Sequence, residues 1–219
     1  MNLSSSKYKR LFLIIPLMLF HIITYNFVGT FKSDVNYSFF LGIDYLIPFV
    51  PEMVWIYMST YLVIPLVGII IEDSRDVTKL AIAIILTWLF TYPIFYFFPA
   101  VYPRPNFEII SLSTEMLNIN YLHDVPNNTF PSLHVSLSFV VAFSMIHITR
   151  KNKILWALWA ILIALSTVML KKHFILDSLG GLIIAQLSFF LAFKQKYVEK
   201  IISFVYNLLK EKVHAEADA

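Results

Sequence analysis

Residues 130–149 read FPSLHVSLSFVVAFSMIHIT, and residues 173–193 read HFILDSLGGLIIAQLSFFLAF. Each stretch has the length of about 20 residues that a helix needs to cross about 30 Å of hydrocarbon. Each also carries a histidine at or near its start and then continues almost without charge. This pattern predicts two membrane-spanning helices, at 131–149 and 173–193, that present chemically active side chains at one end.

Four further apolar segments have the same character, at about 11–29, 52–71, 80–101 and 154–171. Over all 219 residues, 58% are hydrophobic and only 14% are charged, whereas a soluble domain carries about 25% charged residues. The composition therefore excludes an ordinary soluble domain. It predicts an all-α, polytopic membrane protein whose six transmembrane helices form one bundle.

The distribution of basic residues predicts the orientation of this bundle. With the N-terminus inside, the inner segments hold 13 of the 17 Lys and Arg residues. Cytoplasmic loops are enriched in Lys and Arg, so we expect both termini to be cytoplasmic and the protein to be a multi-pass protein of a plasma or inner membrane. The net charge of +3 requires no nucleic-acid partner, and the absence of Cys excludes disulfides and thiolate metal sites.

The chain shows no internal boundary, so we expect one membrane-embedded domain over residues 1–219, with its core at about 11–193. The tail 194–219 mixes apolar residues with lysines, which predicts an amphipathic helix on the inner surface. Residues 30–51 are expected to form an outer loop or a short interfacial helix. Residues 102–130 form the longest polar stretch and are expected to be an outer loop.

The alternating topology brings three polar clusters to one depth on the outer face: residues 102–105, 130–134 and 171–177. In the last cluster His173 and Asp177 are four residues apart and would share one face of a helix. A carboxylate there can accept the imidazole N–H and leave the other ring nitrogen free. An ionisable residue within an apolar span is costly and is by default a functional hypothesis, although a purely structural His–Asp pair fits the spacing as well.

The other two clusters supply groups that suit an anion. Pro131 favours a first helical turn, so the helix that follows would offer free N–H groups and its positive dipole end. Ser132 adds a hydroxyl, and His134 could give or take a proton. Arg104 is held between two prolines and offers a planar guanidinium that matches phosphate oxygens. The simpler interpretations are a packed histidine and an arginine that reaches the membrane interface.

Two histidines, one carboxylate and several cations at one depth indicate phosphoryl transfer. One histidine would attack phosphorus, the other would protonate the leaving oxygen, and the cations would hold the developing charge. The sequence lacks the carboxylate cluster that Mg²⁺ or Ca²⁺ prefers. We therefore expect chemistry without a metal ion or other cofactor.

These residues resemble the type 2 phosphatidic acid phosphatase superfamily of membrane lipid phosphatases and related phosphotransferases. The resemblance covers about residues 97–181: Arg104-Pro105 is similar to the end of the first family motif, 131–134 to the second, and Ser166, His173 and Asp177 to the third. It implies a nucleophilic His173 oriented by Asp177, His134 as the acid, and Arg104 and Ser132 as phosphate ligands.

Two departures from the family pattern remove cations that normally hold phosphate. Phe97 stands where the first motif has Lys, and Thr167 stands where the third has Arg. Lys171 or Lys172, directly before His173, could replace them. The residues around His173 also resemble the branch that contains inositol-phosphoceramide synthases, which transfer a headgroup to a lipid hydroxyl.

The resemblance thus implies a metal-independent lipid phosphatase, which hydrolyses a phosphate monoester or diphosphate of a membrane lipid at the outer leaflet through a phosphohistidine. A headgroup phosphotransferase, with a second lipid as acceptor, is the alternative on the same scaffold. A catalytically silent transporter or assembly partner would account for the missing cations. It would give no reason for His134, His173 and Asp177 to lie at one depth.

Overall fold

The computed structural model describes residues 3–30, 36–124, 127–200 and 202–204. Within these ranges the regular structure is helical, apart from two isolated bridges that join Ala100 to Tyr37 and to Asn128. The all-α prediction is therefore confirmed. In the predicted tail 194–219, residues 196–200 and 202–204 are helical, and residues 201 and 205–219 lie outside the described residues, so most of the predicted amphipathic helix is not described.

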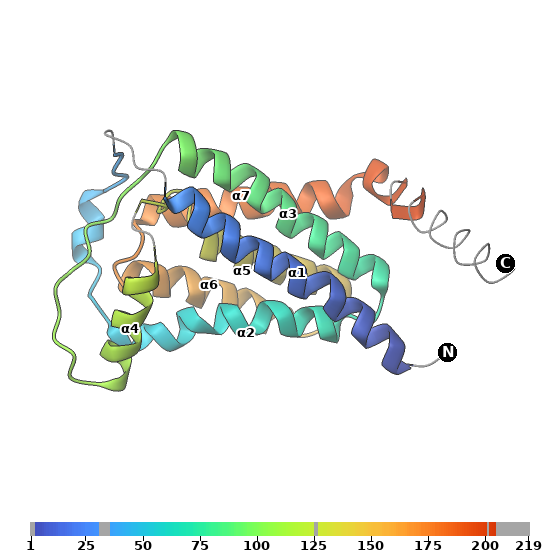
Figure 1. The fold of residues 1–219 in the computed structure, drawn as a ribbon, viewed down its shortest axis with the longest axis horizontal. Coiled ribbons are helices and arrows are strands. Elements are labelled where there is room, and N and C mark those ends of the chain that lie inside the picture. The colour runs from blue at the N-terminus through green and yellow to red at the C-terminus, as the bar shows by residue number, and fades with distance from the viewer. Residues whose placement is uncertain (1–2, 31–35, 125–126, 201, 205–219) are drawn as a thin grey trace, which may run out of the picture.

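Six helices run along the length of the molecule, and a seventh, shorter helix lies across one end (Figure 1). The long helices are α1 (Leu3–Gly29), α2 (Val54–Ile70), α3 (Ser74–Phe97), α5 (Leu133–Thr149), α6 (Lys153–Met169) and α7 (Ile175–Lys194). The short helix is α4 (Leu112–His123), and two 3₁₀ turns, η1 (Gly42–Leu46) and η2 (Pro51–Met53), precede α2.

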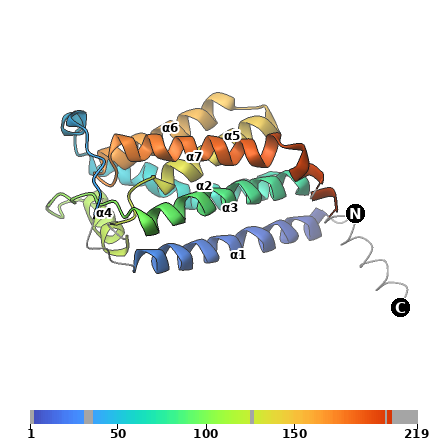
Figure 2. The ribbon, with the colours of Figure 1, turned by 90° about the horizontal axis from the view of Figure 1, so that it is seen from above.

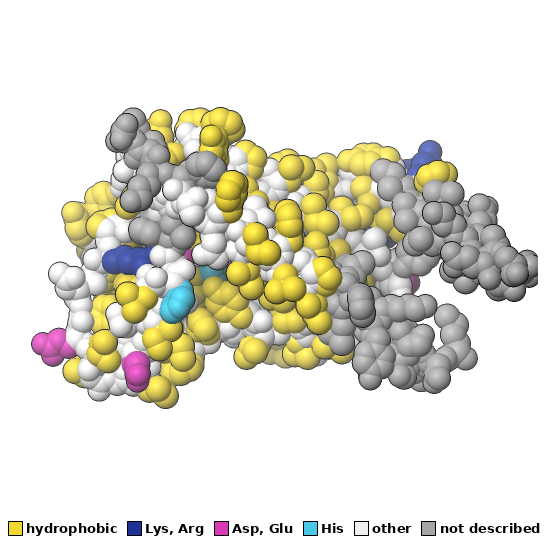
Figure 3. Space-filling view, in the orientation of Figure 1, with side chains coloured by type: hydrophobic (Ala, Val, Ile, Leu, Met, Phe, Trp, Pro, Cys, Tyr) yellow, Lys and Arg dark blue, Asp and Glu magenta, His cyan; other side chains and the backbone are white. Residues whose placement is uncertain are grey.

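Among the described residues, three helical segments are long and apolar enough to cross a membrane, at 51–70, 74–97 and 175–194. Three more apolar stretches are shorter, at 15–29, 133–149 and 153–169. Apolar side chains cover the middle of one face of the bundle, and charged side chains lie near its ends (Figure 3). This distribution is the one that a bilayer favours, and the number of spans and their orientation remain predictions.

The start of α1 and the end of α7 lie at the same end of the bundle, while α4, η1 and the loop after α3 lie at the other end (Figures 1 and 2). We call this second end the loop end. Helix α4 lies within residues 102–130, which were predicted to be an outer loop, so the sequence analysis missed this helix. Ser111 begins this helix with a capping box, because its hydroxyl accepts from Thr114 N.

The ends of several helices differ from the predicted spans for local reasons. Helix α3 begins at Ser74, six residues before the predicted span, because the Asp73 side chain accepts from Arg75 N and caps the helix. It ends at Phe97, because Pro99 follows and cannot continue a helix. Helix α5 begins after Pro131 rather than at it.

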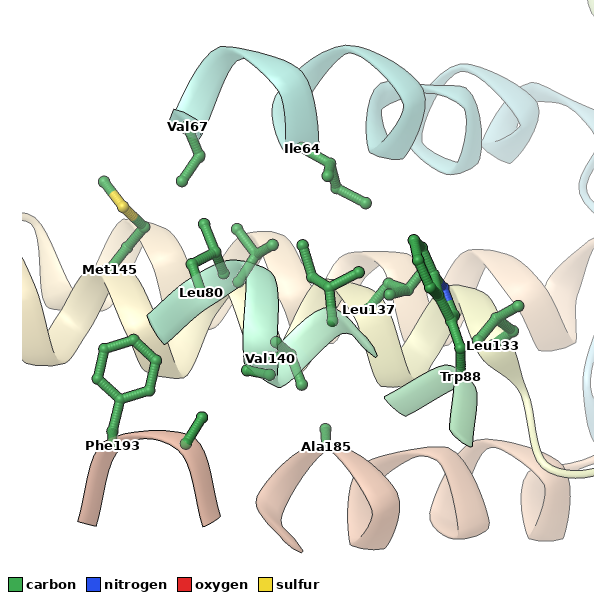
Figure 4. Close-up of a cluster of buried hydrophobic side chains, with 14 of the residues drawn as sticks. Ile64, Val67, Leu80, Trp88, Leu133, Leu137, Val140, Met145, Ala185 and Phe193 are labelled. Carbon is green, nitrogen blue, oxygen red and sulfur yellow. The ribbon is translucent and has the colours of Figure 1, made fainter. Parts of the chain in front are cut away.

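Helix α5 lies at the centre of the bundle and packs against α7, α6 and α3. Its core partners are apolar side chains of α2, α3 and α7, such as Val67, Leu80, Trp88 and Phe193 (Figure 4). Two of its buried serines, Ser136 and Ser144, donate to backbone carbonyl oxygens one turn earlier, whereas the buried Ser138 hydroxyl has no partner among the described residues. The contacts that hold α5 in the bundle are therefore mainly apolar.

Small residues let α7 approach α5 closely. Gly181, Ala185, Ser188 and Ala192 lie on one face of α7, and the last three are fully buried. A Cβ atom at position 181 would lie 2.5 Å from the carbonyl oxygen of Ser132. The two backbones therefore meet near the start of both helices, which is the end that carries the predicted site.

We expect the Gly181→Ala substitution to lower the free energy of unfolding by about 2 kcal/mol, because an added methyl group must push two backbones apart. Gly42→Ala is the matched control, because a Cβ atom there meets nothing within 4 Å. Thermal unfolding of the purified protein in detergent measures both effects. Equal stability of the two variants would contradict the close approach of α5 and α7.

Candidate active site

A cavity of about 230 Å³ lies between α1, α2 and α5. At the loop end it is bounded by the loop after α3 and by the turn between α6 and α7, which carry predicted site residues. Of the predicted site residues, those that line it are Arg104, His134, Lys171, Lys172 and His173. Ser132 and Asp177 do not line it and are fully buried. The folded chain therefore gathers the three polar clusters around one cavity and places two predicted residues behind its wall.

His173 lies in the turn between α6 and α7, two residues before α7 begins. Its Nδ1 atom is 2.8 Å from the carbonyl oxygen of Thr129 and 3.5 Å from Asp177 Oδ2. A carbonyl oxygen only accepts hydrogen bonds, so Nδ1 carries the proton and Nε2 keeps its lone pair. The shared helical face predicted for His173 and Asp177 is wrong, because only Asp177 is within the helix, yet the two side chains remain close.

Asp177 also caps the first turn of α7. Its Oδ2 atom accepts from the backbone N–H of Phe174 at 2.9 Å, which caps the helix. Its Oδ1 atom is buried and accepts no hydrogen bond from the described residues. Asp177 thus holds the start of α7 and places a carboxyl group beside the His173 ring, while the Thr129 carbonyl sets the ring orientation.

His134 lies in the first turn of α5 between two tyrosines of α2. Its Nδ1 atom is 3.0 Å from the Tyr57 hydroxyl, and its Nε2 atom is 3.1 Å from the Tyr61 hydroxyl. The His134 ring also stacks on the Tyr57 ring, with centroids 4.1 Å apart. The sequence analysis missed both tyrosines, although their spacing of one helical turn in the outer half of a predicted span was the available signal.

Arg104 contacts the end of α4. Its guanidinium donates to the carbonyl oxygens of Tyr121 and Asp124, the latter at 2.9 Å, and lies 3.6 Å from the Asp124 carboxylate. It also lies over the Tyr121 ring, 4.7 Å from the centroid. A cation at the C-terminal end of a helix is stabilised by the helix dipole, so α4 fixes Arg104 at the edge of the cavity.

The buried Lys172 forms an ion pair with the partly exposed Asp124 in the same wall. Lys172 Nζ is 2.6 Å from Asp124 Oδ2 and donates to Asn120 Oδ1, and its side chain is only 2% exposed. The Asp124 Oδ1 atom accepts from the Tyr25 hydroxyl of α1 at 2.6 Å. The sequence analysis did not single out Asp124, because nothing in a lone loop carboxylate reveals that it will meet two cations.

The pKa values of Asp124 and Lys172 are shifted by burial and by the contact between the two side chains. Burial alone would raise the pKa of Asp124, but the attraction and hydrogen bond of Lys172 and the hydrogen bond from Tyr25 lower that pKa to about 2. Burial lowers the pKa of Lys172, and Asp124 opposes that shift. The carboxylate is therefore ionised at neutral pH and is the counter-charge that a buried ammonium requires.

Lys171 points away from this pair. It adopts a left-handed backbone conformation, with φ of 52°, which is uncommon for a residue other than glycine. Its Nζ atom donates to the carbonyl oxygens of Ile47, at 2.6 Å, and of Asp44, at 3.2 Å. Its ammonium therefore binds the loop around η1, and the neighbouring Lys172 is the lysine that faces the carboxylate in the cavity wall.

Ser132, which was predicted to bind phosphate, lies where α5 and α7 begin. Its backbone N–H donates to the carbonyl oxygen of Asp177 at 2.9 Å, and its hydroxyl is buried and has no hydrogen-bond partner among the described residues. The side chain is therefore behind the cavity wall, where it links the starts of α5 and α7. The residues that the structure describes contain no group of three or more His, Asp or Glu side chains that could hold a metal ion.

Comparisons with known proteins give a family match and two curated relatives. A family model described as the PAP2 superfamily matches residues 49–191. The protein named "Putative undecaprenyl-diphosphatase YbjG" of Escherichia coli (strain K12) is 32% identical over 129 residues, which are 55% of this chain and 60% of that protein. An uncharacterized protein of Methanocaldococcus jannaschii is 28% identical over 137 residues, 60% of this chain and 55% of that protein.

The chain thus covers less than two thirds of the length of either curated relative. No solved structure matches it. The family match spans α2 to α7 and the cavity wall that they form, whereas α1 and its Tyr25 contact to Asp124 lie outside it.

Replacing Asp124 with Asn should lower the free energy of unfolding by about 3 kcal/mol, because it leaves the Lys172 ammonium buried without a counter-charge. The Asp124 pKa is depressed in the folded protein, so its stabilising effect is complete above the pKa of a free carboxyl, about 4. That effect is lost as the pH falls through about 2.

The stability difference between the wild type and the Asp124→Asn variant should therefore be constant from about pH 8 to pH 5 and shrink below about pH 4. Thermal unfolding in detergent at several pH values measures it. Glu115→Gln, at an exposed carboxylate on α4, serves as the control and should change little. A difference that grows as the pH falls would contradict the ion pair.

Proposed function

The chain belongs to the PAP2 superfamily, and from this premise we propose that it hydrolyses the phosphate monoester or diphosphate of a membrane lipid through a phosphohistidine on His173. The family match confirms the resemblance seen in the motifs. The proposal goes further than the family, because it assigns a reaction, a nucleophile and an acid to residues of this chain.

The observation that carries the proposal is a cavity with one polar end and one apolar end. One end is lined by Arg104, Lys172 and the two histidines, and the other continues between α1, α2 and α5 along Met18, Ile64 and Leu137. A second cavity, of about 30 Å³, shares these three apolar residues and extends toward Trp88 of α3. A polar headgroup joined to a hydrocarbon chain has this shape and polarity.

The proposed reaction uses the two histidines in turn. The His173 Nε2 lone pair forms a bond to phosphorus while the bond from phosphorus to the lipid oxygen breaks, and His134 gives that oxygen a proton. Water then attacks the phosphohistidine and gives a proton back to His134, which releases phosphate. Asp177, 3.5 Å from the ring, stabilises the positive charge that His173 carries in the intermediate.

Two cations are proposed to hold the phosphate oxygens. Arg104 has donors left after its two carbonyl contacts, since a guanidinium has five N–H groups. Thr167 stands where the third family motif has Arg, and Lys172 is proposed to supply the missing positive charge. The free N–H groups at the start of α5 add a third source of positive potential.

The site is proposed to face the extracytoplasmic side, as the distribution of Lys and Arg predicts. The substrate is proposed to be a polyprenyl or diacylglycerol phosphate, and the name of the Escherichia coli relative favours a polyprenyl diphosphate. A lipid alcohol in place of water would make the enzyme a phosphotransferase, and the assay below separates the two reactions.

Purified protein should release inorganic phosphate from lipid phosphates in the presence of EDTA, and faster from a polyprenyl diphosphate or phosphatidic acid than from glycerol phosphate. His173→Ala should abolish release, because no other group supplies the nucleophile, whereas His147→Ala at the opposite end of the bundle should not. Thin-layer chromatography of the lipids, with a phosphate assay, measures both products.

Labelled phosphate should also remain on the wild-type protein after a quench without acid, and should be absent from His173→Ala. Restoration of a lost activity by Mg²⁺, or label on the His173→Ala protein, would contradict the mechanism. Formation of a new phospholipid without free phosphate would replace the hydrolase with the phosphotransferase.

The two neighbouring lysines form a matched pair. Lys172→Ala should reduce kcat by about 100- to 1000-fold, the loss expected when one donor to a developing anion is removed. Lys171→Ala should cost much less, because its ammonium binds carbonyl oxygens around η1. Steady-state kinetics of both variants, with melting temperatures as a control for folding, measure the difference; equal losses would exclude Lys172 as the replacement cation.

A further inference from the structure

The two hydroxyls that hold His134 come from one face of α2. Tyr57 and Tyr61 are four residues apart, so both reach the same imidazole from one helix, one at each ring nitrogen. His134 therefore has no ring nitrogen left over for another partner while both contacts persist. The mechanism above requires one of these nitrogens to meet the leaving oxygen.

The two tyrosines differ in how firmly they are held. Tyr57 is 1% exposed and packs in a buried cluster with Val54, Leu117, Tyr121 and Leu170. Its ring stacks on the imidazole at an interplanar angle of 25°, and Lys172 Nζ lies 4.8 Å from its centroid. Tyr61 is 42% exposed and meets the imidazole edge-on, with centroids 5.5 Å apart. Tyr57 is thus a fixed partner, and Tyr61 is one that can be displaced.

The chemistry of the acid assigns a role to each hydroxyl. When His134 is doubly protonated, both ring N–H groups donate, so the Tyr57 oxygen accepts from Nδ1. If His134 gives up the proton on Nε2, Nδ1 keeps its hydrogen and the bond to Tyr57 keeps its direction, whereas loss of the Nδ1 hydrogen would require the Tyr57 hydroxyl to turn and donate. Since Nδ1 faces a buried phenol, Nε2 is the nitrogen that substrate can reach.

We propose that Tyr57 is a positioning residue for the general acid His134. The Tyr57 hydroxyl accepts from Nδ1–H of His134, so that Nε2 gives and takes the proton. The Tyr61 hydroxyl occupies the place of the leaving oxygen until substrate displaces it. This inference rests on the proposed function. The proton passes from Nε2 to the leaving oxygen as the bond from that oxygen to phosphorus breaks. The water that opens the phosphohistidine returns a proton to the same nitrogen.

Leaving-group dependence tests this assignment. A lipid alkoxide needs a proton as it leaves, whereas an aryl oxide does not, so a weaker acid slows only the first substrate. Tyr57→Phe keeps the stacked ring and removes the hydroxyl. It should lower kcat for a lipid phosphate by about 10- to 100-fold, part of the effect of a general acid, and for an aryl phosphate by less than about threefold, with KM unchanged.

A matched control exists elsewhere in the bundle. The Tyr92 hydroxyl of α3 lies 2.7 Å from Nδ1 of His21, which is the same kind of contact without a role in the mechanism. Tyr92→Phe should leave the ratio of the two rates unchanged, because His21 lines the cavity but transfers no proton in the proposed reaction. Tyr57→Phe should also shift the limb of the pH–rate profile that reports His134, which a purely structural change would not do.

The inference would be overturned if Tyr57→Phe lowered kcat equally for both substrates or left the pH–rate profile unchanged. Turnover by the wild-type protein would still support the proposed function in that case. A leaving-group-dependent loss in Tyr61→Phe but not in Tyr57→Phe would also overturn it, because the two roles would then be reversed. If the wild-type protein cleaves neither phosphate, the proposed function falls and the inference falls with it.

Discussion

The close approach of α5 and α7 at their starts is the constraint on which the site depends. Gly181 lies against the Ser132 carbonyl, and Ser132 N–H donates to the Asp177 carbonyl at 2.9 Å. These contacts bring His134, in the first turn of α5, and His173, just before α7, to the wall of one cavity. Since helices in a bilayer gain little from hydrophobic burial against each other, small residues that allow close packing are what makes this arrangement stable.

A second constraint is electrostatic. The wall of the cavity holds a carboxylate, Asp124, between Arg104 and Lys172, so the positive charge of these two cations is partly balanced. Without that carboxylate, the Lys172 ammonium would be buried without compensation, which is costly in a low dielectric. Tyr25 donates to the same carboxylate and thereby connects α1 to a site that is otherwise built from the family core.

The two positions that depart from the family motifs do not line the cavity. Phe97 ends α3 with 67% of its surface exposed, and Thr167 is buried, with its hydroxyl bonded to the Ala164 carbonyl. Neither position supplies a cation to the cavity. The left-handed backbone of Lys171 separates two neighbouring lysines, so that one reaches the carbonyl oxygens around η1 and the other reaches Asp124.

The sequence by itself determined the helical class, the approximate helices, the family and the three polar clusters that meet at one end, because apolar length and motif spacing are local properties of the chain. It did not reveal α4, the Thr129 carbonyl at His173, or the contacts of His134 with Tyr57 and Tyr61. It also assigned Ser132 to the phosphate, although the structure places that side chain behind the cavity wall. Only the tertiary structure decided these points, because a backbone carbonyl has no sequence signature and the direction of a side chain depends on which helices pack together.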